Sequence, residues 1–443
     1  MSAWGGWGKK RGVEDVTEKL RLGTNAPTLL LSPSLRDLSG GGAANFFAAL
    51  GENDTLKELF ISGHTIDPAP LAAALASNNT LRVLAFGDKN LGDDGVQRFC
   101  DAWANTALET LDLSFKSIGA KGCESLAAML SRSGLRRVFL DRNCIDDVGA
   151  KNLFVGISRC SSLLEVRLGS NKITGEGVRN AAELLHMSSH RLESIDFSGN
   201  PIGDDGAAVL ADLLGHHSNP AGSLKYLNLC KCGIGDSGAI KLLRAVAANS
   251  SSIAGLVLDL SGNAITGAAG AAAGSAIGSG CLQSLLLAEN ALSWGGIKSM
   301  AEAAASGGRS VHLAALDLSQ NGIDAGIDAS NSECLRSLVR CVRAKTLSLL
   351  GNALGGDMVF AIAEELRDSN DVIETLSLAG TGLSGACVSK ILPLFGSPQH
   401  PSLRVLELGG NQLGEEGETA VRALKAANPL LDVAKDKIDG KAK

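Results

Sequence analysis

Apolar residues recur in a fixed order along most of the chain. The unit L-x-x-L-x-L-x-x-N-x-I, in which the L and I positions hold aliphatic or other apolar residues, fits residues 135–145, 163–173 and 403–413, among others. The fourth and sixth positions alternate as they would along a strand, so both point to one face and predict a core layer. Later in each unit, apolar residues lie three to four positions apart, which predicts a helix. The chain is therefore expected to repeat a strand–loop–helix unit.

The ninth position of this unit is mostly asparagine. It falls at 64, 89, 116, 143, 171, 200, 232, 263, 290, 321, 352, 381 and 411, which gives thirteen repeats spaced by 25 to 32 residues, and eight of the thirteen hold Asn. Cys232 and Thr381 are polar substitutes, whereas His64, Lys89 and Lys116 depart from the pattern. Where a chain leaves a strand, buried backbone groups need partners, and an Asn amide offers both donors and an acceptor. We expect these side chains to form a ladder.

A glycine recurs six residues after the ninth position. It stands at Gly95, Gly122, Gly149, Gly177, Gly206, Gly238, Gly296 and Gly417. A residue without a Cβ suits a turn that enters a closely packed helix.

Units of this length, with Asn or Cys at the ninth position, resemble the ribonuclease-inhibitor class of leucine-rich repeats over residues 55–430. The resemblance implies an α/β solenoid of about 13 repeats, a horseshoe with parallel β-strands on the concave face and α-helices on the convex face. The expected organisation is a flexible leader (1–24), an N-terminal capping repeat (25–54) with Phe46, Phe47 and Leu50 on its helix, the repeat domain (55–430) and a polar tail (431–443).

Composition and charge limit the classes of partner and the cellular locations that we expect for this chain. The formal net charge of −6 argues against general nucleic-acid binding, which needs a basic surface. The longest uncharged run, 260–288, is rich in Ala, Gly and Ser and predicts no membrane insertion. The N-terminus has no apolar signal region, and the ten cysteines form no capping cluster. We expect a cytoplasmic protein, with cytoskeletal or ciliary association and a place in a larger assembly as further hypotheses.

Three patterns that could carry chemistry are better explained by the repeat. Residues 233–238 match G-x-G-x-x-G, but similar loops recur at 91–95 and 202–206. Cys230 and Cys232 are the seventh and ninth positions of one repeat and have no second pair at zinc-site spacing. His186 and His190 lie four apart without the glutamate of a metalloprotease motif. We therefore expect no catalytic residues, no metal and no cofactor.

Binding is expected at positions 3, 5, 7 and 8, which have no part in the core and face the concave side or its rim. Aromatic and basic residues, the usual interface anchors, gather there in repeats four to seven: Arg137, Phe139, Arg142, Arg167 and Tyr226. Phe115 and Lys231 are expected on the rim. An acidic series that could attract a basic partner segment follows position 5: Asp112, Asp196, Asp259 and Asp317.

The predicted function is a non-catalytic scaffold or inhibitor that binds another protein on the concave face. The alternative is a regulator of a small GTPase, because residues 55–66 resemble the first repeat of Ran GTPase-activating proteins. The stretch 86–91 is short and lacks the arginine of that family. The leader, with Trp4 and Trp7, is either disordered or a docking segment, and the sequence leaves both open.

Overall fold

The computed structural model describes residues 12–34, 36–38, 42–104, 107–187, 192–215, 224–249, 254–308, 310–324, 329–369, 372–395 and 402–434. Its internal contacts divide the chain into unit 1, Met1–Pro201, and unit 2, Ile202–Lys443. Each unit is described by itself.

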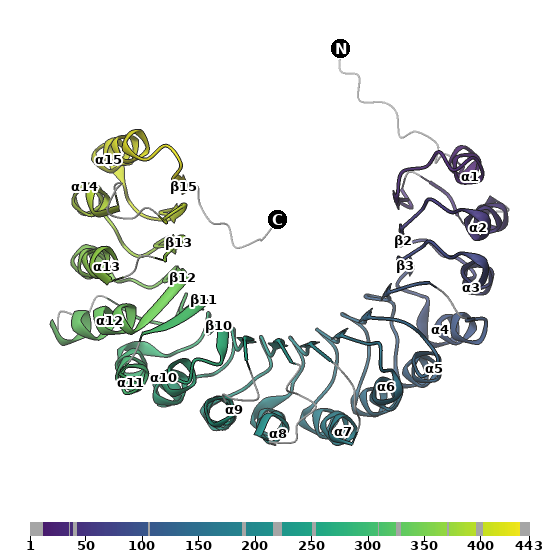
Figure 1. Ribbon diagram of the computed structural model, residues 1–443, viewed down its shortest axis with the longest axis horizontal. Coiled ribbons are helices and arrows are strands. Elements are labelled where there is room, and N and C mark those ends of the chain that lie inside the picture. Colours follow the sequence, from purple (N-terminus) through teal and green to yellow (C-terminus); the bar gives the residue numbers. More distant parts are fainter. Residues whose placement is uncertain are drawn as a thin grey trace, which may run out of the picture. The chain divides into compact units, whose positions relative to one another are not determined.

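Unit 1 alternates strands and helices. Its strands are β1 (Thr28–Leu30), β2 (Glu58–Ser62), β3 (Val83–Gly87), β4 (Thr110–Asp112), β5 (Arg137–Phe139), β6 (Glu165–Arg167) and β7 (Ser194–Asp196). Its helices are α1 (Glu14–Arg21), α2 (Gly42–Glu52), α3 (Pro68–Ser77), α4 (Gly92–Asp101), α5 (Ala120–Leu130), α6 (Asp147–Arg159) and α7 (Gly175–His186). Consecutive strands pair in parallel, so the strands form one side of the unit and the helices the other (Figure 1).

Unit 2 continues the same alternation. Its strands are β8 (Tyr226–Asn228), β9 (Leu256–Asp259), β10 (Leu282–Leu286), β11 (Val311–Asp317), β12 (Val342–Ser348), β13 (Thr375–Ser377), β14 (Val405–Glu407) and β15 (Asp432–Ala434). Its helices are α8 (Gly203–Gly215), α9 (Asp236–Ala248), α10 (Gly270–Gly278), α11 (Ser293–Ala305), α12 (Ala329–Cys341), α13 (Gly355–Ser369), α14 (Gly385–Ile391) and α15 (Gly414–Ala427), with short 3₁₀ turns at Gly267–Ala269 and Leu392–Phe395. All of these strands again pair in parallel with their neighbours in sequence.

The core lies between strands and helices, as the alternation predicts. In β5 and just after it, Val138 and Leu140 are fully buried at the fourth and sixth positions. Leu153 and Phe154 of α6 are equally buried and close the layer from the helix side. Burial of each such side chain contributes roughly 1.5–3 kcal/mol. The α/β solenoid fold is therefore confirmed, with the thirteen predicted repeats corresponding to β2–β14 among the described strands.

The asparagine ladder also forms. Asn171 Nδ2 donates to Leu140 O (3.0 Å) in the preceding repeat and to Leu168 O (2.9 Å) in its own. Its Oδ1 accepts from the backbone N–H of Ile145 at 3.1 Å. The same pattern of bonds recurs at Asn143, Asn200, Asn263, Asn290, Asn352 and Asn411. Each amide therefore ties two successive repeats together through buried backbone groups.

The residues that replace Asn keep only part of this function. Thr381 Oγ1 donates to Leu378 O at 2.7 Å, within its own repeat. The His64 ring contacts Leu31 O in the preceding repeat at 3.0 Å. Lys116 is buried, and this burial lowers the pKa of its ammonium group.

The two ends differ from the prediction. Helix α1 lies within the segment assigned to a flexible leader, and Val13, Val16 and Leu20 are buried there. At the other end, β15 adds to β14 with Leu431 and Val433 buried, inside the segment assigned to a polar tail. Both segments are parts of the solenoid because they cover core surface that a terminal repeat would otherwise expose. The rest of the leader and tail, including Trp4 and Trp7, lies outside the described residues.

No helix in the described ranges has the length and apolar character that crossing a membrane requires.

Candidate functional site

The parallel register places the predicted binding residues of unit 1 in two rows across β4–β7. The row at position 5 is Asp112, Phe139, Arg167 and Asp196. The row at position 3 is Thr110, Arg137, Glu165 and Ser194. The structure therefore brings Phe139, Arg167 and Arg137 together on neighbouring strands, as expected.

The centre of this face is a stacked pair. Arg167 Cζ lies 4.4 Å from the ring centroid of Phe139, a cation–π geometry worth about 0.5–1 kcal/mol at an exposed site. Arg167 Nε also donates to Glu165 Oε1 at 2.8 Å. In the same row as Glu165, Arg137 Nε donates to Thr110 Oγ1 at 2.9 Å. These contacts hold both guanidinium groups against the strands and fix the position of each.

Three of the predicted binding residues share an unusual backbone conformation. Phe115, Arg142 and Lys231 occupy position 8 with φ of 62°, 54° and 55°. Several other repeats place glycine there, also with positive φ: Gly63, Gly199, Gly262, Gly351, Gly380 and Gly410. A bulky side chain in this region costs about 1–2 kcal/mol that glycine avoids. Phe115 nevertheless stands there with 57% of its surface exposed.

The acidic series has a local structural role. Each carboxylate accepts from the backbone N–H two residues further on: Asp112 from Ser114 (2.8 Å), Asp196 from Ser198 (2.7 Å), Asp259 from Ser261 (2.9 Å) and Asp317 from Ser319 (2.9 Å). Such bonds shape the turn that follows a strand. The series is also interrupted, because Phe139 and Arg167 separate Asp112 from Asp196 and Leu286 separates Asp259 from Asp317.

The sequence prediction missed Asp141, which lies at position 7 of the repeat that contains Phe139. Its Oδ1 accepts from Gly169 N at 2.7 Å. Burial raises the pKa of Asp141, and the nearby charges of Asp196 and Asp112 raise it further, while Arg167 opposes them. The sequence could have indicated Asp141 through its place in the repeat, because position 7 lies directly after the strand.

Tyr226 and Lys231 belong to unit 2. Tyr226 is half-buried at position 3 of β8. Lys231 Nζ lies 3.1 Å from Glu289 Oε2, and this partner raises the pKa of Lys231. The lysine stem passes over Gly262, where an added Cβ would lie 2.6 Å from Lys231 Cγ. Glycine at 262 is therefore needed for this ion pair to span three repeats.

The backbone N–H groups of the glycine-rich segment 233–238 already bind a carboxylate of the same chain. The backbone N–H groups of Gly235 and Gly238 donate to Asp204 Oδ1 at 2.7 and 3.0 Å. In a nucleotide site, such amides at a helix N-terminus would face a phosphate. Asp147 does the same for Thr174 and Gly177 in unit 1. The recurrent glycine is thus explained, since a Cβ on Gly238 would lie 2.7 Å from Asp204 Oδ1.

The remaining chemical candidates are Cys232 and two histidines. Cys232 is buried, and its backbone N–H donates to Asn263 Oδ1 at 3.0 Å. His186 is exposed at the end of α7, while His190 lies outside the described residues. Within the described ranges, no three His, Cys, Asp or Glu side chains gather as a metal site would require.

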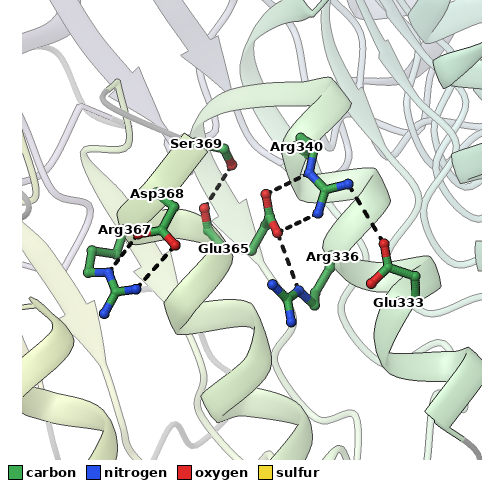
Figure 2. Close-up of polar contacts among 7 residues, drawn as sticks. All are labelled: Glu333, Arg336, Arg340, Glu365, Arg367, Asp368 and Ser369. Carbon is green, nitrogen blue, oxygen red and sulfur yellow. Dashed lines mark hydrogen bonds and ion pairs between the residues drawn. The ribbon is translucent and has the colours of Figure 1, made fainter.

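Figure 2 shows an ion cluster that the sequence did not suggest, between α12 and α13. The side chain of Glu365 is only 5% exposed; its Oε1 accepts from Arg340 Nε at 2.8 Å and its Oε2 from Arg340 Nη2 at 2.7 Å. Arg336 Nε adds a third bond at 3.3 Å. The hydrogen bonds from Arg340 lower the pKa of Glu365. Because both carboxylate oxygens are paired with arginines, this cluster joins two helices and offers no reactive group.

Repeats of a strand and a helix, joined by buried amides and without a cluster of reactive side chains among the described residues, define a leucine-rich-repeat protein. The leucine-rich repeat family model matches residues 104–127, 159–180, 188–211, 223–243 and 399–420. The chain carries repeats of the ribonuclease-inhibitor type, as predicted.

Individual relatives agree with this class. Ribonuclease inhibitor from Sus scrofa is 27% identical over 372 residues, which are 76% of this chain and 78% of that protein. NACHT, LRR and PYD domains-containing protein 13 from Homo sapiens is 30% identical over 192 residues, 42% of this chain and 18% of that protein. Ribonuclease inhibitor from Mus musculus is 29% identical over 185 residues, 41% of this chain and 40% of that protein. The last two matches thus span less than half of the relative's length.

Proposed function

We propose that this chain is a non-catalytic scaffold or inhibitor that binds a protein partner on the strand face of unit 1. The observation that carries the proposal is the stacked pair of Phe139 and Arg167. Aromatic and arginine side chains are enriched at the centres of protein interfaces. Glu165 already orients the guanidinium, so less side-chain freedom would be lost on binding.

The neighbouring residues extend this proposed surface. Phe115 and Arg142 would contribute at the rim, and Arg137 would contribute beside the pair. Asp112 and Asp196 would flank it and steer a partner's basic groups toward it, since exposed charges affect association rates more than affinity. In unit 2, Tyr226, Lys231, Asp259 and Asp317 remain candidates for a separate contact.

A protein is proposed as the partner rather than a nucleic acid, because the chain has a net charge of −6 and the face contains several carboxylates. The name of the pig relative makes a ribonuclease the first protein to test. A cytoplasmic location is proposed because all ten cysteines are free thiols and five of them are buried.

The test compares wild type with Phe139→Ala/Arg167→Ala and with a control, Val148→Ala. Val148 is exposed on α6, on the helix side of the same unit, so the control also removes surface apolar area. Each protein would be used for capture from a cell lysate with quantitative mass spectrometry and for inhibition of ribonucleases.

We expect a partner that wild type and Val148→Ala hold equally and that the double variant holds at least about tenfold more weakly. Equal thermal midpoints would show that the fold is intact. A double variant that retains every partner would contradict the proposed surface. Stimulated GTP hydrolysis by a small GTPase would instead favour the alternative function, and a nucleic acid held by all three proteins would contradict the proposed partner class.

A further inference from the structure

Two strands of unit 2 are longer than the others. β11 and β12 each have seven residues, whereas β8, β13, β14 and β15 have three. The extra residues pair Val311 with Val342, His312 with Arg343 and Leu313 with Ala344. Val311 and Leu313 are buried while His312 between them is exposed. The sheet therefore continues at its N-terminal edge in these repeats and turns His312 and Arg343 away from the core.

This extension forms one side of a hollow. Its volume is about 300 Å³, and its lining consists of Gln283, His312, Leu313, Ala314, Arg343, Lys345 and Val372. Gln283, Ala314 and Lys345 occupy the second position of three successive repeats. The small side chain of Ala314 leaves space between two long ones, and Ala314 and Val372 contribute apolar surface.

Basic and polar groups surround that apolar surface. Arg343 Nε donates to the carbonyl oxygen of Ser369 at 3.0 Å, which holds the guanidinium in the lining. Lys345 Nζ lies 3.0 Å from Glu374 Oε1, and both side chains are at least half exposed. An exposed ion pair of this kind is weak, so Lys345 can turn to a stronger anion at little cost.

We propose that this hollow binds a small phosphate monoester. Arginine and lysine are the side chains that most often hold phosphate, the arginine through a planar fork and the lysine as a point charge. The imidazole of His312 and the amide of Gln283 supply further donors. The apolar surface would take the organic group of the ester, and the volume lies at the lower end of the range for small-molecule sites. The site is independent of the surface proposed in unit 1.

The test is titration calorimetry of the full chain at low ionic strength, with phenyl phosphate and inorganic phosphate as probes. We expect saturable binding of both, tighter for phenyl phosphate because its ring would contact Ala314 and Val372. Lys345→Gln should weaken phenyl phosphate binding about tenfold, the effect of losing a hydrogen bond to a charged group. Lys225→Gln is the matched control, because Lys225 holds the same repeat position, directly before β8, and carries the same charge.

Two further variants make the test sharper. Glu374→Gln removes the carboxylate that competes for Lys345 and should strengthen binding about two- to fivefold. Ala314→Leu keeps every charge but fills the hollow and should abolish phenyl phosphate binding; Leu164 occupies the same position in another repeat, so the fold tolerates it. Circular dichroism and thermal midpoints would confirm folding.

The proposal would be overturned by a wild type that binds neither probe saturably, or by equal affinities of Lys345→Gln and Lys225→Gln. Undiminished binding by Ala314→Leu would also exclude the hollow. Equal affinity for the two probes would show that the apolar surface holds no organic group and would overturn the assignment to a monoester.

Discussion

Replacement of Asn352 by alanine should strongly destabilise unit 2. Asn352 is 1% exposed. Its Nδ2 donates to Leu318 O at 2.9 Å and to Leu349 O at 3.0 Å. Its Oδ1 accepts from the backbone N–H groups of Asn321 at 2.9 Å and Ile323 at 3.2 Å. Alanine would leave Leu318 O and the N–H groups of Asn321 and Ile323 without these bonds. Leu349 O would keep its 3.3 Å bond from the backbone N–H of residue 352.

The magnitude follows from the three groups that would lose their bonds. An unsatisfied buried donor or acceptor costs about 1–3 kcal/mol. A water molecule that enters the space left by the amide would recover part of the loss. We therefore expect the free energy of unfolding to fall by about 3–5 kcal/mol. Because each repeat contacts mainly its neighbours, the loss should appear in the transition of unit 2.

Urea unfolding followed by circular dichroism measures this difference. The control is Asn152→Ala, since Asn152 is half-buried on α6 and makes one bond, to Ala120 O at 3.3 Å. It should cost less than about 1 kcal/mol. Asn352→Thr should lie between the two alanine variants, because Thr381 shows that a hydroxyl at this position bonds the carbonyl of its own repeat. If Asn352→Ala cost no more than Asn152→Ala, the ladder would not be a main source of stability.

Three further predictions concern stability. Gly238→Ala should lower the free energy of unfolding by about 2 kcal/mol, because the added Cβ would meet Asp204. Gly134→Ala should leave the free energy of unfolding unchanged, because nothing lies within 4 Å of the added Cβ. Thermal unfolding of the two variants measures the difference. Glu365→Gln should cost about 2 kcal/mol at neutral pH. Because the folded state lowers the pKa of Glu365 below 4.5, the carboxylate stabilises the fold above that value, and the difference from wild type should shrink as pH falls below it in urea titrations. Lys116→Asn should raise the midpoint of urea unfolding, by about 1 kcal/mol in free energy, since an amide would replace a buried cation in the ladder.

The sequence predicts the repeat well because its signals are local. The fourth, sixth and ninth positions lie within six residues of one another, so the strand, its buried face and the ladder follow from a short pattern. The bonds of Asp204 were missed because its partner Gly238 lies 34 residues further on, in the next repeat. The recurrence of Gly-Asp-Asp-Gly at 92–95 and 203–206 was the available signal, and only the stacking of repeats reveals its purpose.

The candidate site was predicted less completely, for a different reason. A row of side chains on a parallel sheet depends on register between strands, and the sequence gives the residues of each row but not their contacts. Arg167 was predicted as an exposed anchor, and the structure adds its stacking on Phe139 and its bond to Glu165. The aspartates were predicted as one charged face, whereas their bonds to backbone N–H groups give them a role in turns.

Position 8 offers a way to separate stability from binding. Glycine occupies position 8 with positive φ in six repeats, so the fold itself does not require a side chain at this position. Phe115 keeps a large exposed ring at φ 62° and gains little burial in return. Phe115→Gly should therefore raise the free energy of unfolding by about 1 kcal/mol in urea titrations. If Phe115 belongs to the binding surface of unit 1, the same variant should hold the partner more weakly while it is more stable. A variant that loses stability would show that the ring packs as a structural element, and one that gains stability with unchanged binding would remove Phe115 from the surface.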